Sequence, residues 1–282
     1  MPYLLFLLLC LLASCTETAD NAQELNAQTS PSVTSPAEVA TSSEPERVVP
    51  LDSLPPWPAI RSIRYVTGKF TPKDHPDMVL VPAELTDGDG SYHMHRAALE
   101  SFKRMHAAAK ADGVSLSIVS AFRNFTRQKA IWEAKWNGKR LLEGKDKADE
   151  VYPDPAKRAL AILRYSSMPS TSRHHWGTDI DINRLNNEYF ASGTGKNVYD
   201  WLTENAATYG FCQTYTPLGK ERPNGYQEEK WHWSYLPIAQ QLTGFAEQYL
   251  SYEHITGFAG AESASSIEVI PKYVLGINKA CQ

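Results

Sequence analysis

The chain has 282 residues, of which 42% are hydrophobic, and this supports a core for one large domain or two small ones. Its formal net charge of −4 gives no general attraction to nucleic acid or to an anionic membrane. We therefore expect no nucleic-acid partner, and the function has to be sought in local motifs.

The N-terminus has the features of a lipoprotein signal peptide. Residues 1–13 form an almost unbroken apolar run, which is too short to cross a membrane but has the length of a signal-peptide core. The run ends in Leu12-Ala13-Ser14-Cys15, which resembles a bacterial lipobox, although no Lys or Arg precedes it. We predict cleavage before Cys15 and a lipid anchor on that cysteine. An ordinary secretory signal that contains a cysteine is the alternative.

Composition divides the chain into three parts, of which residues 1–14 are the predicted signal peptide. Residues 15–55 are rich in Thr, Ser, Ala, Pro, Glu and Gln without hydrophobic periodicity, so they are expected to form a disordered tether. Residues 56–282 are expected to form one folded domain, with a core at about 92–252 and a C-terminal extension at 253–282.

Hydrophobic spacing and capping residues predict the elements of this domain in chain order. Helices are expected over residues 92–111, after the segment 121–128 to about 136, and over 155–165, 197–209 and 237–252. Strands are expected over 114–121, 178–182 and 230–235, with a further strand beginning at Phe211. A long polar loop is expected from 137 to 153.

The cysteines leave one pair for a disulfide. Cys10 leaves with the signal peptide and Cys15 carries the lipid, so Cys212 and Cys281 remain in an oxidising compartment and can pair. Two unrelated buried thiols are the alternative, because pairing depends on a distance that the sequence does not give.

The segment from Ser172 to Asp181 contains the clearest chemical motif. It places His174 and Asp181 seven residues apart, with Gly177 between them. The glycine can let the chain turn, so that both side chains reach the same face. Its position favours His174 over His175 as a metal ligand, and Asp179 competes with Asp181 for the carboxylate role.

A second motif supplies another imidazole and another carboxylate. His232 lies in a strand-like aromatic run, and Glu229 precedes it by three residues. Two histidines and one aspartate form the ligand set of a catalytic zinc site, in which a fourth position stays open for water. Glu229 is then available as the general base and acid, with Glu228 as its competitor.

Other polar residues complete the set of candidates. Arg123 lies between a predicted strand and a predicted helix, where it could stabilise charge on a reacting carbonyl oxygen; a surface salt bridge is the alternative. His93, His95 and His106 have no accompanying carboxylate in a ligand-like pattern, so they are interpreted as surface residues.

These motifs together resemble the zinc D-alanyl-D-alanine carboxypeptidases of the VanY type, within the LAS-type metallopeptidases that also include dipeptidases and LD-carboxypeptidases. The resemblance rests on Ser172-x-His174-x-x-Gly177-x-x-x-Asp181 followed by Glu229-x-x-His232. The segments Ala121-Phe122-Arg123-Asn124-Phe125-x-x-Gln128 and Asn205-Ala206-Ala207-Thr208-Tyr209-Gly210-Phe211 also resemble family segments, so that roughly residues 95–240 are covered. Asp179 departs from the pattern, because the family usually has alanine there.

The resemblance implies zinc on His174, Asp181 and His232, Glu229 as general base and acid, and Arg123 as the group that polarises the carbonyl. It also implies that Ser172 and Gln128 contact the substrate. The implied fold is α+β, a small and mainly antiparallel sheet with surrounding helices in a single catalytic domain.

The implied function is removal of a terminal D-alanine from peptidoglycan stem peptides. A monomeric enzyme, anchored in the bacterial cell envelope and facing the periplasm or cell wall, is expected. The alternatives are a peptidoglycan endopeptidase, a D-Ala-D-Ala dipeptidase, and a non-catalytic lipoprotein that binds the cell wall.

Overall fold

The computed structural model describes residues 61–88 and 90–282, which all lie within one compact unit assigned to residues 47–282. The predicted signal peptide, with Cys15, and the predicted tether lie outside the described residues. Within the described ranges, no helix combines the length and the apolar character that a membrane crossing requires.

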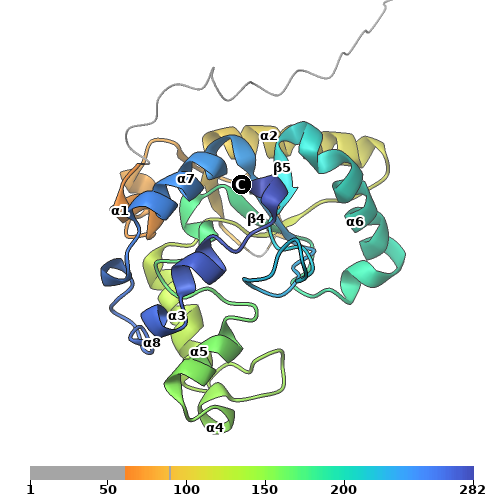
Figure 1. Ribbon diagram of the computed structural model, residues 1–282. Coiled ribbons are helices and arrows are strands. Elements are labelled where there is room, and N and C mark those ends of the chain that lie inside the picture. The colour runs from red at the N-terminus through yellow and green to blue at the C-terminus, as the bar shows by residue number, and fades with distance from the viewer. Residues whose placement is uncertain (1–60, 89) are drawn as a thin grey trace, which may run out of the picture. The chain divides into compact units, whose positions relative to one another are not determined.

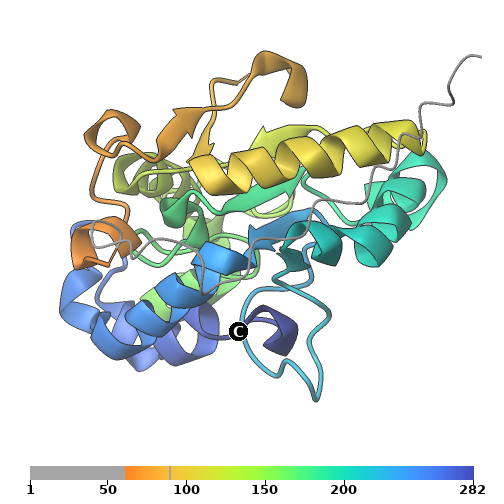
Figure 2. The ribbon, with the colours of Figure 1, turned by 90° about the horizontal axis from the view of Figure 1, so that it is seen from above.

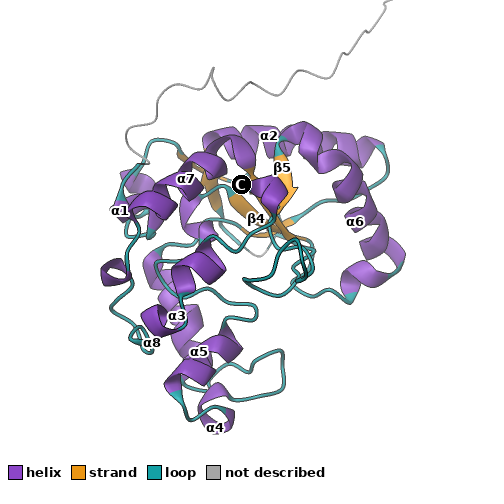
Figure 3. Cartoon of the chain, in the orientation of Figure 1, coloured by secondary structure: helices purple, strands orange, loops and turns teal. Residues whose placement is uncertain are grey.

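A four-stranded antiparallel sheet forms the centre of this unit (Figure 3). Its strands follow the order β3 (Ile118–Ser120), β4 (Asp179–Ile182), β6 (His232–Tyr235) and β5 (Phe211–Gln213). A separate antiparallel pair joins β1 (Met78–Leu80) to β2 (His93–His95). Helices surround the strands, so the predicted α+β class with a small antiparallel sheet is confirmed.

The longer helices form two groups around the sheet (Figure 1). Their bounds, with those of the one-turn helices, are α1 (Ile63–Val66), α2 (Arg96–Ala111), α3 (Phe125–Trp136), α4 (Ala148–Val151), α5 (Pro155–Ile162), α6 (Gly193–Asn205), α7 (Leu236–Tyr249) and α8 (Ser263–Ser266). In Figure 1, α3, α4, α5 and α8 gather together, away from α2 and α6. In Figure 2, α2 crosses over the strands, and Phe102 of α2 meets Phe211 of β5 edge to face.

Capping residues explain where the helices that carry the site begin. The Asn124 side chain accepts a hydrogen bond from the backbone N–H of Arg127 and so starts α3. Asp154 caps the N–H of Lys157 in the same way, and Pro155 occupies the first helical position of α5, as the sequence predicts. Trp132 and Trp136 are buried on one side of α3, which leaves another face of that helix for the site.

Two expectations for the region before β3 were wrong. The helix predicted from residue 92 begins at Arg96, because residues 93–95 form β2 and pair with β1, which the sequence did not predict. His95, interpreted as a surface residue, is fully buried, and its Nδ1 accepts a hydrogen bond from the N–H of Ala97 at the start of α2. The strand predicted over 114–121 is also shorter, at Ile118–Ser120.

The C-terminal extension folds back onto the sheet. Cys212 of β5 and Cys281 are joined by a disulfide, with their Cα atoms 5.8 Å apart. Close by, the N–H of Asn278 donates to the carbonyl of Thr214. The end of the chain is therefore fixed beside β5, which pairs with the strand that carries His232.

Candidate active site

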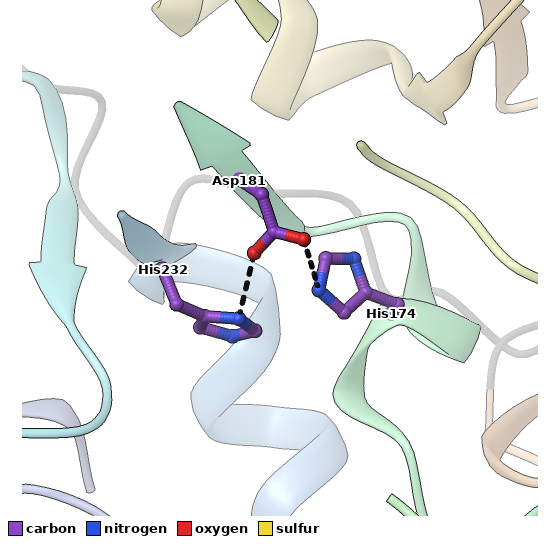
Figure 4. Close-up of side chains that lie close together, drawn as sticks. All are labelled: His174, Asp181 and His232. Atoms are coloured by element: carbon purple, nitrogen blue, oxygen red, sulfur yellow. Dashed lines mark hydrogen bonds and ion pairs between the residues drawn. The ribbon is translucent and has the colours of Figure 1, made fainter. Parts of the chain in front are cut away.

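Strand pairing brings the predicted metal ligands together. Asp181 of β4 and His232 of β6 are direct cross-strand partners, and both are buried. His174 lies in η4, a 3-10 helix spanning Arg173–Trp176, which immediately precedes β4. One ligand atom from each of the three residues lies within 4.8 Å of the others. Both histidine side chains point toward the Asp181 carboxylate (Figure 4).

Gly177 makes this convergence possible. It ends η4 with a φ of 72°, the left-handed conformation that residues with a Cβ rarely adopt. A Cβ at this position would lie 2.8 Å from the Met78 side chain and 3.1 Å from the backbone N of His95. Close approach of the β1–β2 pair and the reversal of the chain between His174 and Asp181 therefore both require glycine.

The tautomer of His174 leaves the lone pair of Nε2 without a hydrogen-bond donor to accept from. Its Nδ1 lies 2.8 Å from the carbonyl oxygen of Ala121, so Nδ1 carries the proton and donates it there. The buried Nε2 has no hydrogen-bond partner among residues 61–88 and 90–282, although it lies 3.3 Å from Asp181 Oδ2. Burial and the nearby charge of Arg123 lower the pKa of His174, which keeps it neutral. Two electron-pair donors thus face each other, and a cation fits between them.

His232 contacts a carboxylate on each side of its ring. Its Nδ1 lies 3.1 Å from Asp181 Oδ1, and its Nε2 lies 2.9 Å from Asp179 Oδ2. Burial disfavours the charged imidazole, but the hydrogen bonds to Asp179 and Asp181 outweigh it and raise the pKa of His232 to about 9. A metal at Nδ1 would replace that proton, and the Nε2–H would still donate to Asp179.

Asp179, the competitor for the ligand role, is engaged elsewhere. Its carboxylate accepts hydrogen bonds from Arg173 Nε at 3.0 Å and from the hydroxyls of Thr178 and Ser234, each at 2.8 Å. Arg173 and Asp179 are both fully buried. The Asp179 carboxylate therefore orients the His232 ring and neutralises Arg173, and Asp181 is left to face the ligand cluster.

Glu229 lies beside the cluster, whereas Glu228 does not. Glu229 Oε2 is 3.5 Å from His232 Nδ1, and the side chain lines a pocket of about 1230 Å³ that contains the three ligands. Burial raises the pKa of Glu229 to about 8. Glu228 is absent from the pocket lining within the described ranges, and its carbonyl accepts a hydrogen bond from Asn187.

Comparison with known proteins agrees with this geometry. Residues 91–238 match the family model described as VanY, D-alanyl-D-alanine carboxypeptidase. The chain belongs to the VanY family. A D-alanyl-D-alanine carboxypeptidase of Enterococcus faecalis (strain ATCC 700802 / V583) is 34% identical over 134 residues, which are 46% of this chain and 44% of that protein. This chain therefore spans less than half the length of that curated relative, and a Bacillus subtilis (strain 168) relative is matched over 46% of its length.

Two solved structures of VanY proteins also align with this chain, the first of them a mutant in which one glutamate is replaced by alanine. One is a VanY D,D-pentapeptidase from a VanB-type vancomycin resistance cassette in complex with Zn(II), with 25% identity, a TM-score of 0.41, and coverage of 65% of this chain and 93% of that one. The other is VanYB in complex with D-alanine-D-alanine, with 28% identity, a TM-score of 0.41, and coverage of 58% and 83%.

The remaining predicted residues of the VanY family site differ in their surroundings. Arg123 lines the pocket and forms no ion pair with a carboxylate of the described chain, so it is not the surface salt bridge considered as the alternative. Gln128 also lines the pocket, and its amide donates to the carbonyl of Ser167. Ser172 is buried, its hydroxyl has no hydrogen-bond partner among the described residues, and it is not among the pocket-lining residues. His175 points away, toward Gly68.

Sequence analysis missed several groups in the pocket of this VanY family chain. Tyr215 packs against His232, with their ring centroids 4.7 Å apart. Arg127, Lys135 and Arg140 line the wall formed by α3 and the residue stretch that follows it. The available signal was helical spacing, since Lys135 lies seven residues after Gln128 and so shares its face.

Proposed function

We propose that this protein is a zinc metallopeptidase that removes a terminal D-alanine from peptidoglycan stem peptides. Membership of the VanY family supports the reaction and the substrate class. The observation that carries the proposal is the placement of Glu229 against a buried histidine–aspartate–histidine cluster inside a large pocket. A structural metal site needs no such carboxylate beside its ligands.

The residues present fit a zinc ion. His174 Nε2, Asp181 and His232 Nδ1 would hold it, since these are the donor types that zinc prefers and they are already oriented by their other hydrogen bonds. Bound there, zinc supplies Lewis acidity and lowers the pKa of a water molecule. Three protein ligands leave room for such a water, as a catalytic site requires.

Glu229 and Arg123 supply the remaining chemistry. Burial raises the pKa of the Glu229 carboxyl, and a cation held by the three ligands would lower it again, so that the carboxylate can accept a proton from the attacking water and return it to the leaving amine near neutral pH. The guanidinium of Arg123 is charged at any working pH and can donate hydrogen bonds to the carbonyl oxygen as negative charge develops there. Its buried Nε has no hydrogen-bond partner in the part of the chain that the structure describes, so the group is available to a substrate.

The proposal is tested by mass spectrometry of muropeptides incubated with the purified protein, with and without a zinc chelator. We expect pentapeptides to lose one alanine in a chelator-sensitive reaction. Loss of one alanine from tetrapeptides instead would indicate an LD-carboxypeptidase, and cleavage only of cross-linked peptides an endopeptidase. Absence of any chelator-sensitive cleavage would contradict the proposal and favour a cell-wall-binding protein.

The Glu229→Gln variant adds a control for the assigned role. We expect it to retain zinc and to lose activity by roughly 100-fold or more, because general acid–base catalysis contributes about that much. Glu228→Gln is the matched control, since its side chain lies outside the pocket lining and should leave the rate nearly unchanged. Equal rates for wild-type protein and Glu229→Gln would remove Glu229 from this role.

We also propose that the protein is a lipoprotein of the bacterial cell envelope, with Cys15 as its lipidated residue. The sequence Leu12-Ala13-Ser14-Cys15 at the end of an apolar run supports this. A Cys15→Ser variant should lose the lipid mass at its N-terminus and leave the membrane fraction. Recovery of that variant in membranes with the same mass shift would contradict the proposal.

A further inference from the structure

One wall of the pocket carries positive charge that the protein itself does not neutralise. Arg123 precedes α3, Arg127 and Lys135 lie on it, and Arg140 follows it; all four line the pocket. Among the described residues, none of the four forms an ion pair with a carboxylate, although the neighbouring Glu143 pairs with Arg164. A pocket wall with several cations outside ion pairs is suited to an anionic ligand.

Lys135 is the most deeply placed side chain of this wall outside the catalytic group. It is partly buried, whereas Arg127 and Arg140 are exposed. Its Nζ donates one hydrogen bond, to the hydroxyl of Ser166 at 2.5 Å, and an ammonium group has three donors. Burial and the charge of Arg140 lower the pKa of Lys135 to about 8, while Glu143 and Glu229 oppose this effect.

The position of Lys135 connects it to the catalytic groups. Arg127, Gln128, Ile131 and Lys135 share the face of α3 that lines the pocket, with helical spacing. The charges of Glu229 and Arg123 both act on Lys135, so the ammonium lies within electrostatic reach of the reacting centre. Ser166 and Ser167, which bond Lys135 and Gln128, form the facing edge of the same pocket.

We propose that Lys135, with the Ser166 hydroxyl, forms a subsite that binds a carboxylate of the peptide substrate. This inference rests on the proposed function. A stem pentapeptide with lysine at its third position, the probe used below, carries two such groups, the carboxylate of the terminal D-alanine and the α-carboxylate of the γ-linked glutamate. A lysine and a hydroxyl can donate to either one, and a charge-assisted hydrogen bond in a partly dry pocket is stronger than one in water.

A structural role explains Lys135 less well. Its one side-chain hydrogen bond within the described part of the chain joins α3 to the segment after α5, and the neutral Gln128 side chain already makes the same connection at the neighbouring Ser167. A partly buried ammonium without an ion-pair partner is unfavourable for folding, and the charges of Glu143 and Glu229 offset this only in part, since the pKa of Lys135 remains lowered. A ligand carboxylate would offset it.

The test measures how Lys135 and each peptide carboxylate depend on one another. Binding is measured by calorimetry in a Glu229→Gln background, which prevents turnover. The probes are a stem pentapeptide, the same peptide amidated at its C-terminus, and the same peptide amidated at the glutamate α-carboxyl. Lys135→Met is compared with Lys139→Met, which removes an exposed lysine outside the pocket lining. Thermal unfolding of each variant shows that it is folded.

We expect Lys135→Met to weaken binding of the unmodified pentapeptide roughly 10- to 100-fold, as for loss of a hydrogen bond to a charged group. We expect Lys139→Met to have no such effect. The substitution should have little further effect on one of the two amidated peptides, and that peptide identifies which carboxylate Lys135 binds. Lys135→Arg, which keeps the charge, should retain part of the affinity.

Two results would overturn the inference. If Lys135→Met weakens all three peptides equally, or none of them, then Lys135 binds neither carboxylate. If the Glu229→Gln protein with Lys135 unchanged still binds the unmodified pentapeptide, the proposed function is not affected. If that protein binds none of the three peptides, both the subsite and the proposed function are wrong.

Discussion

Buried polar side chains in this molecule fall into two groups, and the difference identifies the residues that are free to act. Asp179 accepts four hydrogen bonds, from Arg173, Thr178, His232 and Ser234. In contrast, four buried atoms at or next to the ligand cluster have no hydrogen-bond partner among the described residues, namely Arg123 Nε, Gln128 Oε1, Ser172 Oγ and His174 Nε2, as is also true of some buried hydroxyls elsewhere. A buried polar atom without a partner is unfavourable, so those that line the pocket are free to bind an external partner.

The satisfied residue Asp179 should stabilise both the fold and the metal site. Asp179→Asn leaves the buried Arg173 without a counter-ion, which should lower the free energy of unfolding by about 3–5 kcal/mol. It also weakens the acceptor that orients His232, so metal affinity should fall roughly 10- to 100-fold. Denaturant titration and chelator competition measure the two effects. A double variant, Arg173→Met with Asp179→Ala, should recover part of the stability; wild-type stability in Asp179→Asn would contradict the assignment.

Lys135 should destabilise the folded protein in a pH-dependent way. Its pKa is about 8 in the folded state against an ordinary value of 10.5, so between these values the unfolded chain binds more protons. The free energy of unfolding should therefore rise with pH across this window, relative to Lys135→Met. Below pH 8 the variant should be the more stable protein.

Chemical denaturation at several pH values tests this expectation. The difference between wild type and Lys135→Met should shrink as the pH rises above about 8. Lys139→Met serves as the control, since an exposed ammonium is solvated in both states and its removal should produce no trend. A difference for Lys135→Met that stays constant with pH would show that the ammonium is not disfavoured in the pocket.

At the scale of elements, the sequence predicted the four strands of the central sheet and the longer helices, but it missed the β1–β2 pair. The start of α5 was predicted from its cap Asp154, because a cap is a local feature that a short stretch of sequence contains, whereas the cap of α3, Asn124, was not recognised and that helix begins earlier than expected. The β1–β2 pair was missed because Met78–Leu80 and His93–His95 are three residues each and too short for an alternating pattern. Burial of His95 follows from that pairing, so it could not be predicted either.

For the site, the sequence predicted the metal-ligand cluster but not the residues that surround it. The spacing of His174, Asp181 and His232 was sufficient to propose the cluster, which the structure brings together. The roles of Asp179 and Lys135 depend on contacts between segments far apart in the sequence, such as Asp179 with Ser234. From the sequence alone, Asp179 could be named only as an alternative metal ligand to Asp181, because two residues that are two positions apart on a strand lie on the same face.

Gly177 lies in the turn between η4 and β4, so its replacement should shift the position of His174 relative to Asp181. Gly177→Ala places a Cβ in the left-handed region, at a cost of about 1–2 kcal/mol, and also against Met78 and His95. Gly113→Ala is a matched control, since Gly113 has a φ of 76° and its added Cβ meets nothing within 4 Å. We expect both variants to lose stability and only Gly177→Ala to lose metal affinity as well. Equal metal affinity in both would show that crowding at Gly177 does not displace the ligands.

At the scale of the whole molecule, segments outside the region matched by the VanY family form hydrogen bonds with elements that carry the site. The match covers residues 91–238, yet both flanking regions contact the core. Near the N-terminal end of the described chain, the Tyr65 hydroxyl donates to the carbonyl of Trp176, which adjoins the metal ligands. In the C-terminal extension, the carbonyl of Ala259 accepts a hydrogen bond from the indole of Trp132 on α3. The α3 helix, which carries Lys135, is therefore held in place partly by its contact with the C-terminal extension.

The disulfide between Cys212 and Cys281 fixes the far end of this extension, so its loss should reduce stability more than activity. It closes a loop with a sequence separation of 69, and removing such a cross-link typically lowers the free energy of unfolding by about 2–4 kcal/mol. Cys281→Ala, Cys212→Ala and the double variant should be equally destabilised, because each removes the same bond. Denaturant titration, with and without a reductant, measures this.

At temperatures where the variants stay folded they should keep most of their activity, because neither cysteine lines the pocket. Additive losses in the double variant, or no effect of reductant on the wild type, would show that the two cysteines act separately and that other contacts hold the extension in place.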